Sequence, residues 1–250
     1  MLVDSQFEPH AEDLVSAIRE LSDGEIRFLI NTHVHPDHIG GNAPLATGGV
    51  LIFAHDNMRV RMLEERSRFP RGNGGFFPQA PVEALPFVTY HDRITFHFNG
   101  EEVRVFLAPP AHTDGDTFVH FPESDVLHLG DVFRTTSYPI IDVYNGVTLA
   151  GTIEALDLAI SLAGPNTKVI PGHGVELVGR RELVEFRDMI VDVRDRVRDL
   201  IAEGNTLDEV MAAKPTAAYD EQWGNVPSWS ANDFVPIGYH QLGGGSLYKQ

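Results

Sequence analysis

Four side chains that can bind metal ions lie within six residues of one another: His33, His35, Asp37 and His38. They directly follow the apolar run Ile26–Ile30, which reads as a buried strand, so the cluster is expected at a strand end. Histidines two apart on an extended segment point the same way, and His33 and His35 can therefore bind one cation. The turn that follows directs Asp37 and His38 toward a second.

A polar loop that happens to be rich in histidine is the alternative interpretation of this cluster. Burying its four polar side chains without a metal would leave several of them unpaired, which favours the metal site. Three further candidate ligands each follow an apolar, strand-like run: His112, Asp131 and His173. They are far apart in sequence but could converge in space.

At this point the chain resembles the metallo-β-lactamase superfamily of hydrolases. The resemblance rests on the His-x-His-x-Asp-His motif at 33–38, on the three later ligands in the family's order, and on Leu2-Val3-Asp4, which is similar to the family's first motif. It covers nearly the whole chain from Asp4. It implies two metal sites with seven ligands: His33, His35 and His112 for the first, Asp37, His38 and His173 for the second, and Asp131 as the bridge.

This ligand set implies a dinuclear zinc hydrolase with two Zn²⁺ per chain, although iron or manganese would also fit. Two cations about 3.5–4 Å apart share a water and lower its pKa toward about 7, which gives a bridging hydroxide nucleophile. The expected substrate is a small amide or ester, similar to a β-lactam or a lactone. Asp37 and Asp131 are the predicted catalytic residues, because Asp37 would orient the hydroxide and Asp131 would fix the spacing of the metals.

Three other functions remain open. A thioester hydrolase of the glyoxalase II type is similar in its ligands, but such enzymes use a basic C-terminal region, and after Arg198 only Lys214 and Lys249 are basic. An iron-containing oxidoreductase similar to persulfide dioxygenases would not need His38 and Asp131 as ligands. A metal-binding protein that has lost catalysis is the third.

Composition limits the partners. The chain has 19 basic against 36 acidic residues and a formal charge of −17, which argues against nucleic acid or an anionic membrane surface as partner. We expect a small-molecule substrate and allow for a homo-oligomer. The sequence has no cysteine, so it forms no disulfides, and no apolar run approaches the ~20 residues of a membrane span.

Strand and helix signals alternate along 250 residues without a linker, which predicts one domain over residues 1–242 and a flexible tail over 243–250. The expected class is α+β, with the four-layer αβ/βα sandwich that the resemblance implies. Only three residues precede Asp4, so we expect the first sheet to be shortened at the N-terminus. The sequence leaves two cellular compartments as alternatives: cytoplasmic as the sequence is written, or periplasmic if an upstream signal peptide has been removed.

Five residues are candidates for substrate binding. Phe76 and Phe77 lie in the Gly/Pro/Phe-rich run Arg68–Pro81, which is long for a connection and could form a flap over an apolar substrate. Arg134 could receive a substrate carboxylate, and Tyr138 or Tyr144 could donate to an oxyanion. The alternatives are an ordered loop, a surface arginine and core tyrosines. His55 is expected to be structural rather than a ligand.

Overall fold

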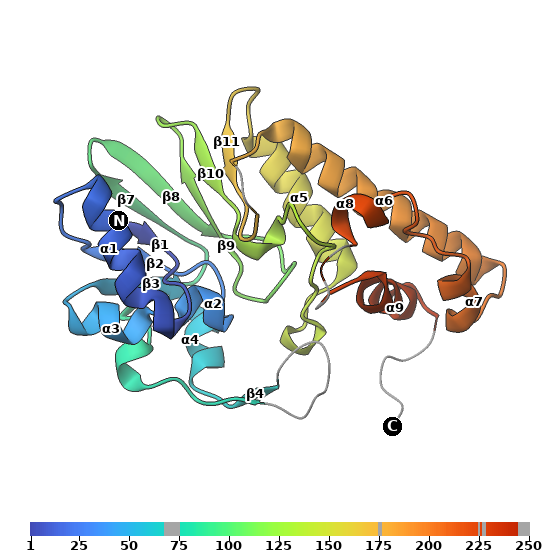
Figure 1. The fold of residues 1–250 in the computed structure, drawn as a ribbon, viewed down its shortest axis with the longest axis horizontal. Coiled ribbons are helices and arrows are strands. Elements are labelled where there is room, and N and C mark those ends of the chain that lie inside the picture. Colours follow the sequence, from blue (N-terminus) through green and yellow to red (C-terminus); the bar gives the residue numbers. More distant parts are fainter. Residues whose placement is uncertain (68–75, 175–176, 225, 227–228, 245–250) are drawn as a thin grey trace.

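The structure is a computed structural model that describes residues 1–67, 76–174, 177–224, 226 and 229–244. Two β-sheets lie face to face in the middle of the molecule, and helices cover the outer face of each (Figure 1). The predicted α+β class and the αβ/βα sandwich are therefore confirmed. None of the helices described is both long enough and apolar enough to cross a bilayer.

The first sheet has four parallel strands in the order β1-β2-β3-β6. Its strands and the helices beside them are β1 (Leu2–Val3), α1 (Ala11–Leu21), β2 (Phe28–Ile30), α2 (Pro36–Ile39), α3 (Asn42–Thr47), β3 (Leu51–His55), α4 (Asp56–Met62) and β6 (Val88–Tyr90). Because parallel strands share one direction, the loops after β2 and β3 leave the sheet at the same edge.

The second sheet has five strands in the order β11-β10-β9-β8-β7, of which only β10 and β11 are parallel. They are β7 (Arg93–Phe98), β8 (Glu101–Leu107), β9 (Thr117–Phe121), β10 (Val126–His128) and β11 (Lys168–Ile170), with α5 (Leu149–Leu162) and α6 (Arg180–Ala202) on the outer face. A tight turn joins β7 to β8, and its residues Asn99 and Gly100 both have positive φ.

Alternation along the strands separates the core into layers. In β2, Ile30 packs with Phe53 against Val105 of the facing sheet, whereas Leu29 packs on the other side with Leu45 of α3. The outer core of the second sheet joins its strands to α5 and α6. These buried layers fix the two sheets relative to each other and so determine which strand ends meet.

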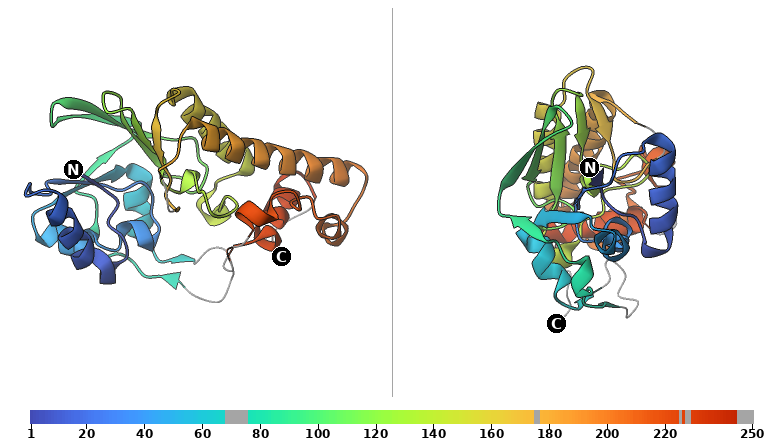
Figure 2. Two further views of the ribbon diagram at one scale, coloured as in Figure 1. Left: turned by 45° about the horizontal axis from the view of Figure 1, so that its top comes forward. Right: turned by 90° about the vertical axis from the view of Figure 1, so that its left-hand side faces the viewer.

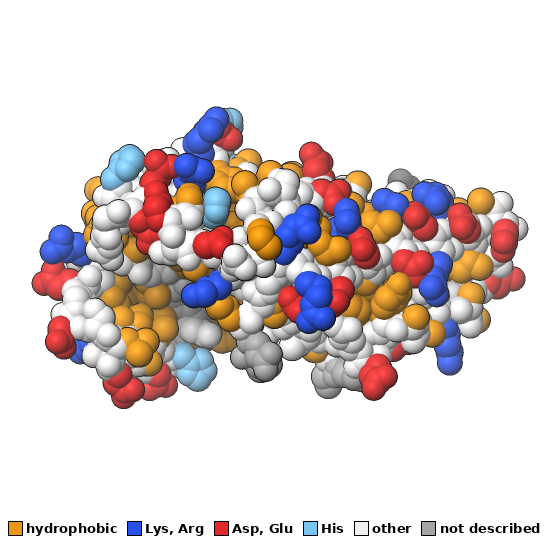
Figure 3. Space-filling model, turned by 90° about the horizontal axis from the view of Figure 1, so that it is seen from above, with side chains coloured by type: hydrophobic (Ala, Val, Ile, Leu, Met, Phe, Trp, Pro, Cys, Tyr) orange, Lys and Arg blue, Asp and Glu red, His pale blue; other side chains and the backbone are white. Residues whose placement is uncertain are grey.

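The C-terminal helices extend to one side of the sandwich (Figure 2). They are α6, α7 (Leu207–Ala212), α8 (Asp220–Trp223) and α9 (Ala231–Gln241). Acidic and basic side chains are interspersed over this end of the molecule (Figure 3), and arginines of α6 pair with neighbouring aspartates, as Arg196 does with Asp192. This surface is an ordinary solvated helix face. Residues 245–250, most of the predicted tail, lie outside the described part.

Four short 3-10 helices and one small hairpin complete the described structure. The 3-10 helices are η1 (Glu8–His10), η2 (Val82–Ala84), η3 (Gly130–Val132) and η4 (Val143–Asn145). The hairpin pairs β4 (Arg66–Ser67) with β5 (Phe76–Phe77). Residues 76 and 77 belong to the run Arg68–Pro81, in which a flap or an ordered loop is expected, and they pair as a strand. Residues 68–75 lie outside the description.

Candidate metal centre

All seven predicted ligands follow the ends of strands at one edge of the sandwich. His33 and His35 come after β2, with Asp37 and His38 in the adjoining α2; His112 comes after β8, Asp131 lies in η3 after β10, and His173 comes after β11. In the second sheet, β8 and β10 both run antiparallel to β9, and β11 runs parallel to β10, so the ends of β8, β10 and β11 lie at the same edge. The sequence placed each ligand at a strand end, and the structure shows that these ends converge.

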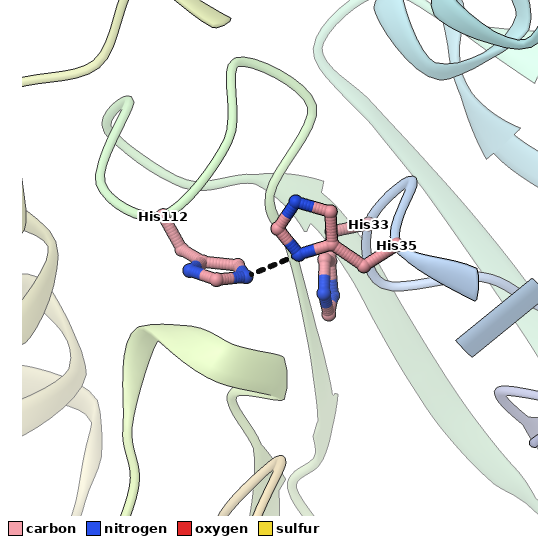
Figure 4. Close-up of side chains that lie close together, drawn as sticks. All are labelled: His33, His35 and His112. Atoms are coloured by element: carbon pink, nitrogen blue, oxygen red, sulfur yellow. Dashed lines mark hydrogen bonds between the residues drawn. The ribbon is translucent and has the colours of Figure 1, made fainter. Parts of the chain in front are cut away.

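The first group consists of His33, His35 and His112 (Figure 4). One ring nitrogen from each lies within 4.8 Å of the other two. His112 Nε2 and His35 Nδ1 face each other at 2.8 Å, and His33 Nε2 is buried with no hydrogen-bond partner among the described residues. Burial lowers the pKa of His112 to about 3, and burial together with the charges of neighbouring imidazoles holds the pKa of His33 well below its usual range. Both rings are therefore neutral and carry a lone pair.

The outer nitrogens of these rings show which atoms face inward. His112 Nδ1 donates to the carbonyl of Ile140 at 2.6 Å, and His35 Nε2 donates to Asp142 Oδ2 at 3.1 Å. The other nitrogens of the two rings, His112 Nε2 and His35 Nδ1, point toward each other and toward the position between the three histidines. Lone pairs directed at one point need a cation, so the donor set of this group fits a metal ion.

The second group consists of Asp37, His38 and His173. His173 Nε2 lies 2.9 Å from Asp37 Oδ2, and His38 Nε2 lies 3.6 Å from the same oxygen. Burial alone would lower the pKa of His38, but the charges of Asp4 and Asp131 raise it well above its usual value. A divalent cation at this position would take the place of that proton.

Asp131 lies between the two groups, as expected of a bridging carboxylate. Its Oδ1 is 3.2 Å from His38 Nε2, and its Oδ2 is 3.6 Å from His112 Nε2 and 3.3 Å from His173 Nε2. The side chain is buried, and Oδ1 has no hydrogen-bond partner among the residues described. One carboxylate thus reaches histidines of both groups.

Residues behind the ligands hold them in place. Asp4 Oδ2 accepts from His38 Nδ1 at 2.7 Å, and Asp4 also accepts from the backbone N–H and hydroxyl of Thr32. The sequence indicated Asp4 as a family motif but not this contact. It did not indicate Asp142 at all, and nothing in the local pattern near position 142 could have done so. Gly172 was also missed, although the Pro-Gly-His-Gly run at 171–174 was a signal: a Cβ there would collide with Asp131.

Two of the predicted substrate residues line a hollow next to His35. Phe77 and Tyr144 border a cavity of about 210 Å³, together with Arg61 and the metal candidate His35. Tyr144 is 44% exposed, which suits a surface that meets a ligand. The side chain of Phe76 lies outside the described part.

The other two predicted substrate residues lie elsewhere than expected. Arg134 is buried, and its guanidinium donates to Asp131 Oδ2 at 2.5 Å and to Ser137 Oγ at 2.8 Å, so its charge neutralises a protein carboxylate rather than a substrate. Tyr138 has no exposed surface, and its hydroxyl donates to Asp220 Oδ1 at 2.7 Å. It packs as a core residue, as in the alternative interpretation. His55 is structural, with both ring nitrogens hydrogen-bonded to backbone groups.

Comparison with known proteins shows the family to which the chain belongs. The model of the metallo-beta-lactamase superfamily matches residues 1–173, which is more than half of the chain. The chain belongs to the metallo-β-lactamase superfamily. Among curated superfamily proteins, it is 23% identical to a linear primary-alkylsulfatase of Pseudomonas sp. (strain ATCC 19151), over 79% of this chain and 44% of that protein. It is 22% identical to the metallo-beta-lactamase type 2 of Bacillus cereus, over 76% of this chain and 68% of the other.

Solved structures of the superfamily show the same fold. A metallo-beta-lactamase from Pontibacter korlensis matches with a TM-score of 0.59 and 19% identity, over 76% of this chain and 82% of that one. The sec-alkylsulfatase Pisa1 from Pseudomonas sp. matches with a TM-score of 0.66 and 17% identity, over 99% of this chain and 46% of that one. The chain thus spans less than half the length of the alkylsulfatases it matches.

Proposed function

We propose that the chain is a hydrolase that binds two divalent cations, most suitably zinc, and cleaves a small amide or ester such as a β-lactam or a lactone. The observation that carries this proposal is that three buried ligand-type atoms lie close together, none with a hydrogen-bond partner among the described residues: His33 Nε2, His38 Nε2 and Asp131 Oδ1. Nitrogen and oxygen atoms of these kinds are zinc ligands. Leaving them unpaired in a dry site would be costly, which is the physical reason to place cations there.

Two cations held there would supply an activated water, with a pKa lowered toward about 7, and would polarise the carbonyl of the substrate. The chain's own residues supply orientation. The Asp37 side chain is 21% exposed, so its carboxylate can accept a hydrogen bond from a water at the open side of the site. Burial alone would raise the pKa of Asp131, but the charge of His38 and hydrogen bonds from His173 and His38 hold this pKa well below its usual value, and Oδ2 also accepts from Arg134.

The hollow beside His35 is where a substrate would lie. Its volume of about 210 Å³ is below the roughly 300–1,000 Å³ typical of ligand pockets, so it would hold one group of a small molecule rather than a large substrate. Phe77 and Tyr144 would contact that group, and the scissile bond of the substrate would be directed toward His35, which lines the same hollow. This size supports a small amide or ester.

Sulfate-ester hydrolysis is a second candidate. The observation that favours it is coverage: the alkylsulfatase structure matches 99% of this chain, including the helices after residue 173, whereas the lactamase structure matches 76%. An alkyl sulfate is also an ester that a bound cation could polarise. We therefore include it among the substrates to be tested.

The test is a substrate panel on the zinc-loaded protein. It contains a chromogenic β-lactam, a lactone, a glutathione thioester and an alkyl sulfate, with Asp131→Asn as the variant that keeps side-chain size. Turnover of the β-lactam or the lactone by the wild type, falling about 100-fold or more in the variant, supports the proposal, whereas turnover of the thioester or the alkyl sulfate alone supports that activity instead. Asp220→Asn is the control, because Asp220 contacts Tyr138 rather than a ligand.

Metal analysis separates the hydrolase from the other classes. About two zinc ions per chain together with turnover agree with the proposal. One iron per chain together with oxygen consumption would show the oxidoreductase instead. Bound zinc with no turnover across the panel would indicate a metal-binding protein without this activity.

A further inference from the structure

The segment 140–145, between η3 and α5, contacts two histidines of the first group. The carbonyl of Ile140 accepts from His112 Nδ1 at 2.6 Å, and the backbone N–H of Asp142 donates to the carbonyl of His112 at 3.1 Å. The carboxylate of Asp142 then reaches across to His35 Nε2 at 3.1 Å. One short segment of chain thus fixes a histidine from each of the two sheets.

Asp142 is itself held firmly. Its exposed fraction is 3%, its Oδ1 accepts from the backbone N–H of Tyr144 at 3.2 Å, and its Oδ2 accepts from Asn145 Nδ2 at 2.6 Å. The first of these contacts also caps η4. A buried carboxylate with both oxygens occupied has little freedom, so it presents a fixed acceptor to His35.

We propose that Asp142 is the positioning residue for His35, and that it sets the affinity of the first metal position for a divalent cation. By accepting from Nε2, it places the proton of the ring on that side and directs the lone pair of Nδ1 toward His112 and His33. Without it, the imidazole can rotate or carry its proton on Nδ1, and either change removes one of three ligands. This inference rests on the proposed metal centre but not on the substrate.

Asp4 provides the matched comparison. It holds His38 Nδ1 at 2.7 Å, so it acts on a histidine of the second group. Each carboxylate therefore contacts one group only. Loss of Asp142 should weaken one of two cation-binding steps, and loss of Asp4 the other.

The experiment is a cobalt titration of the metal-free protein without substrate. Stepwise dissociation constants come from competition with a chromophoric chelator, and visible absorption reports the ligand environment of each ion. In Asp142→Ala we expect one constant to rise about 10–100-fold, with a changed spectrum for that step only, while the other constant stays the same. Asp142→Asn keeps one acceptor oxygen and should give an intermediate value. Asp4→Asn should raise the other constant.

Asn145→Ala is the matched control, because it removes the bond between Asn145 and Asp142 but leaves the carboxylate and its contact with His35. Equal weakening in Asn145→Ala and Asp142→Ala would overturn the proposal, since loosening of the segment would then explain the loss. Unchanged constants in Asp142→Ala, or equal change in both steps, would also overturn it. If Asp142→Ala does not fold, the comparison of Asp142→Asn with Asn145→Ala decides.

The outcome is separate from that of the substrate panel. A wild type that binds two ions and shows this pattern but hydrolyses nothing would keep the inference and reject the proposed activity. A wild type that binds no cobalt would reject both.

Discussion

Gly172 lies where no side chain can be accommodated, and replacing it tests how closely the site is packed. A Cβ at this position would lie 2.6 Å from the carbonyl carbon of Gly130 and 2.7 Å from the backbone nitrogen of Asp131, and closer still to Asp131 Oδ1. Cβ atoms essentially never approach heavy atoms within 3.0 Å. In Gly172→Ala the backbone must therefore separate by about 0.3–0.4 Å, and the Asp131 carboxylate must move further.

These shifts give the expected magnitudes. Overpacking of this kind costs about 1–3 kcal/mol of unfolding free energy. A carboxylate displaced by about 1 Å no longer fits between the histidines of both groups, and such a displacement costs about 100-fold in turnover, or about 2.7 kcal/mol. We expect Gly172→Ala to lower kcat/KM about 100-fold and to reduce bound metal by chelator competition.

The control is a second glycine-to-alanine change. Gly238 lies within α9, and the nearest atom to its added Cβ is Leu149 Cδ2 at 3.7 Å, an ordinary contact. Gly238→Ala should leave metal content unchanged and raise stability by up to about 1 kcal/mol through helix propensity. Wild-type metal affinity and turnover in Gly172→Ala would refute the reasoning, because it would show that Asp131 can move freely or takes no part.

Three further changes have distinct expected results. Phe77→Ala and Tyr144→Ala should raise KM several-fold with little change in kcat, because both side chains border the hollow and neither belongs to the candidate ligand set; an equal fall in kcat would place them in the chemical step. Tyr138→Phe should cost about 1–3 kcal/mol of stability, by leaving Asp220 without its donor, and should not change KM. Removing metal with a chelator should lower Tm reversibly, since a ligand at 1,000 times its Kd stabilises the folded state by about 4 kcal/mol; an unchanged Tm would argue against tight binding.

Much of the site could be predicted, because metal ligands are recognised by their residue types and by their positions directly after apolar runs. His33, His35 and Asp37 are close in sequence, and His112, Asp131 and His173 each end an apolar run, so pattern alone placed all of them at strand ends. The apolar run Ile26–Ile30 predicted a buried strand, and in the structure Leu29 and Ile30 of β2 pack in the cores on opposite faces of the first sheet.

What could not be predicted were the partners of single polar residues. Arg134 follows Asp131 by three residues, but only the bend of the chain after η3 shows that the two form an ion pair. Tyr138 looked like a loop residue, and only the packing of α8 and α9 around it shows that it is enclosed. Asp142 sits in a segment without periodicity, so its contact with His35 depends entirely on how the two sheets dock.

Each candidate metal position takes residues from both sheets: His33 and His35 with His112 at one, Asp37 and His38 with His173 at the other. During synthesis, the first sixty residues would therefore offer a cation only part of its coordination shell. The coordination shells of both positions can be completed only after about 110 further residues have emerged and the two sheets have packed against each other. Loading with metal would then mark the end of folding, and a chain arrested halfway would hold its ions weakly and exchange them readily.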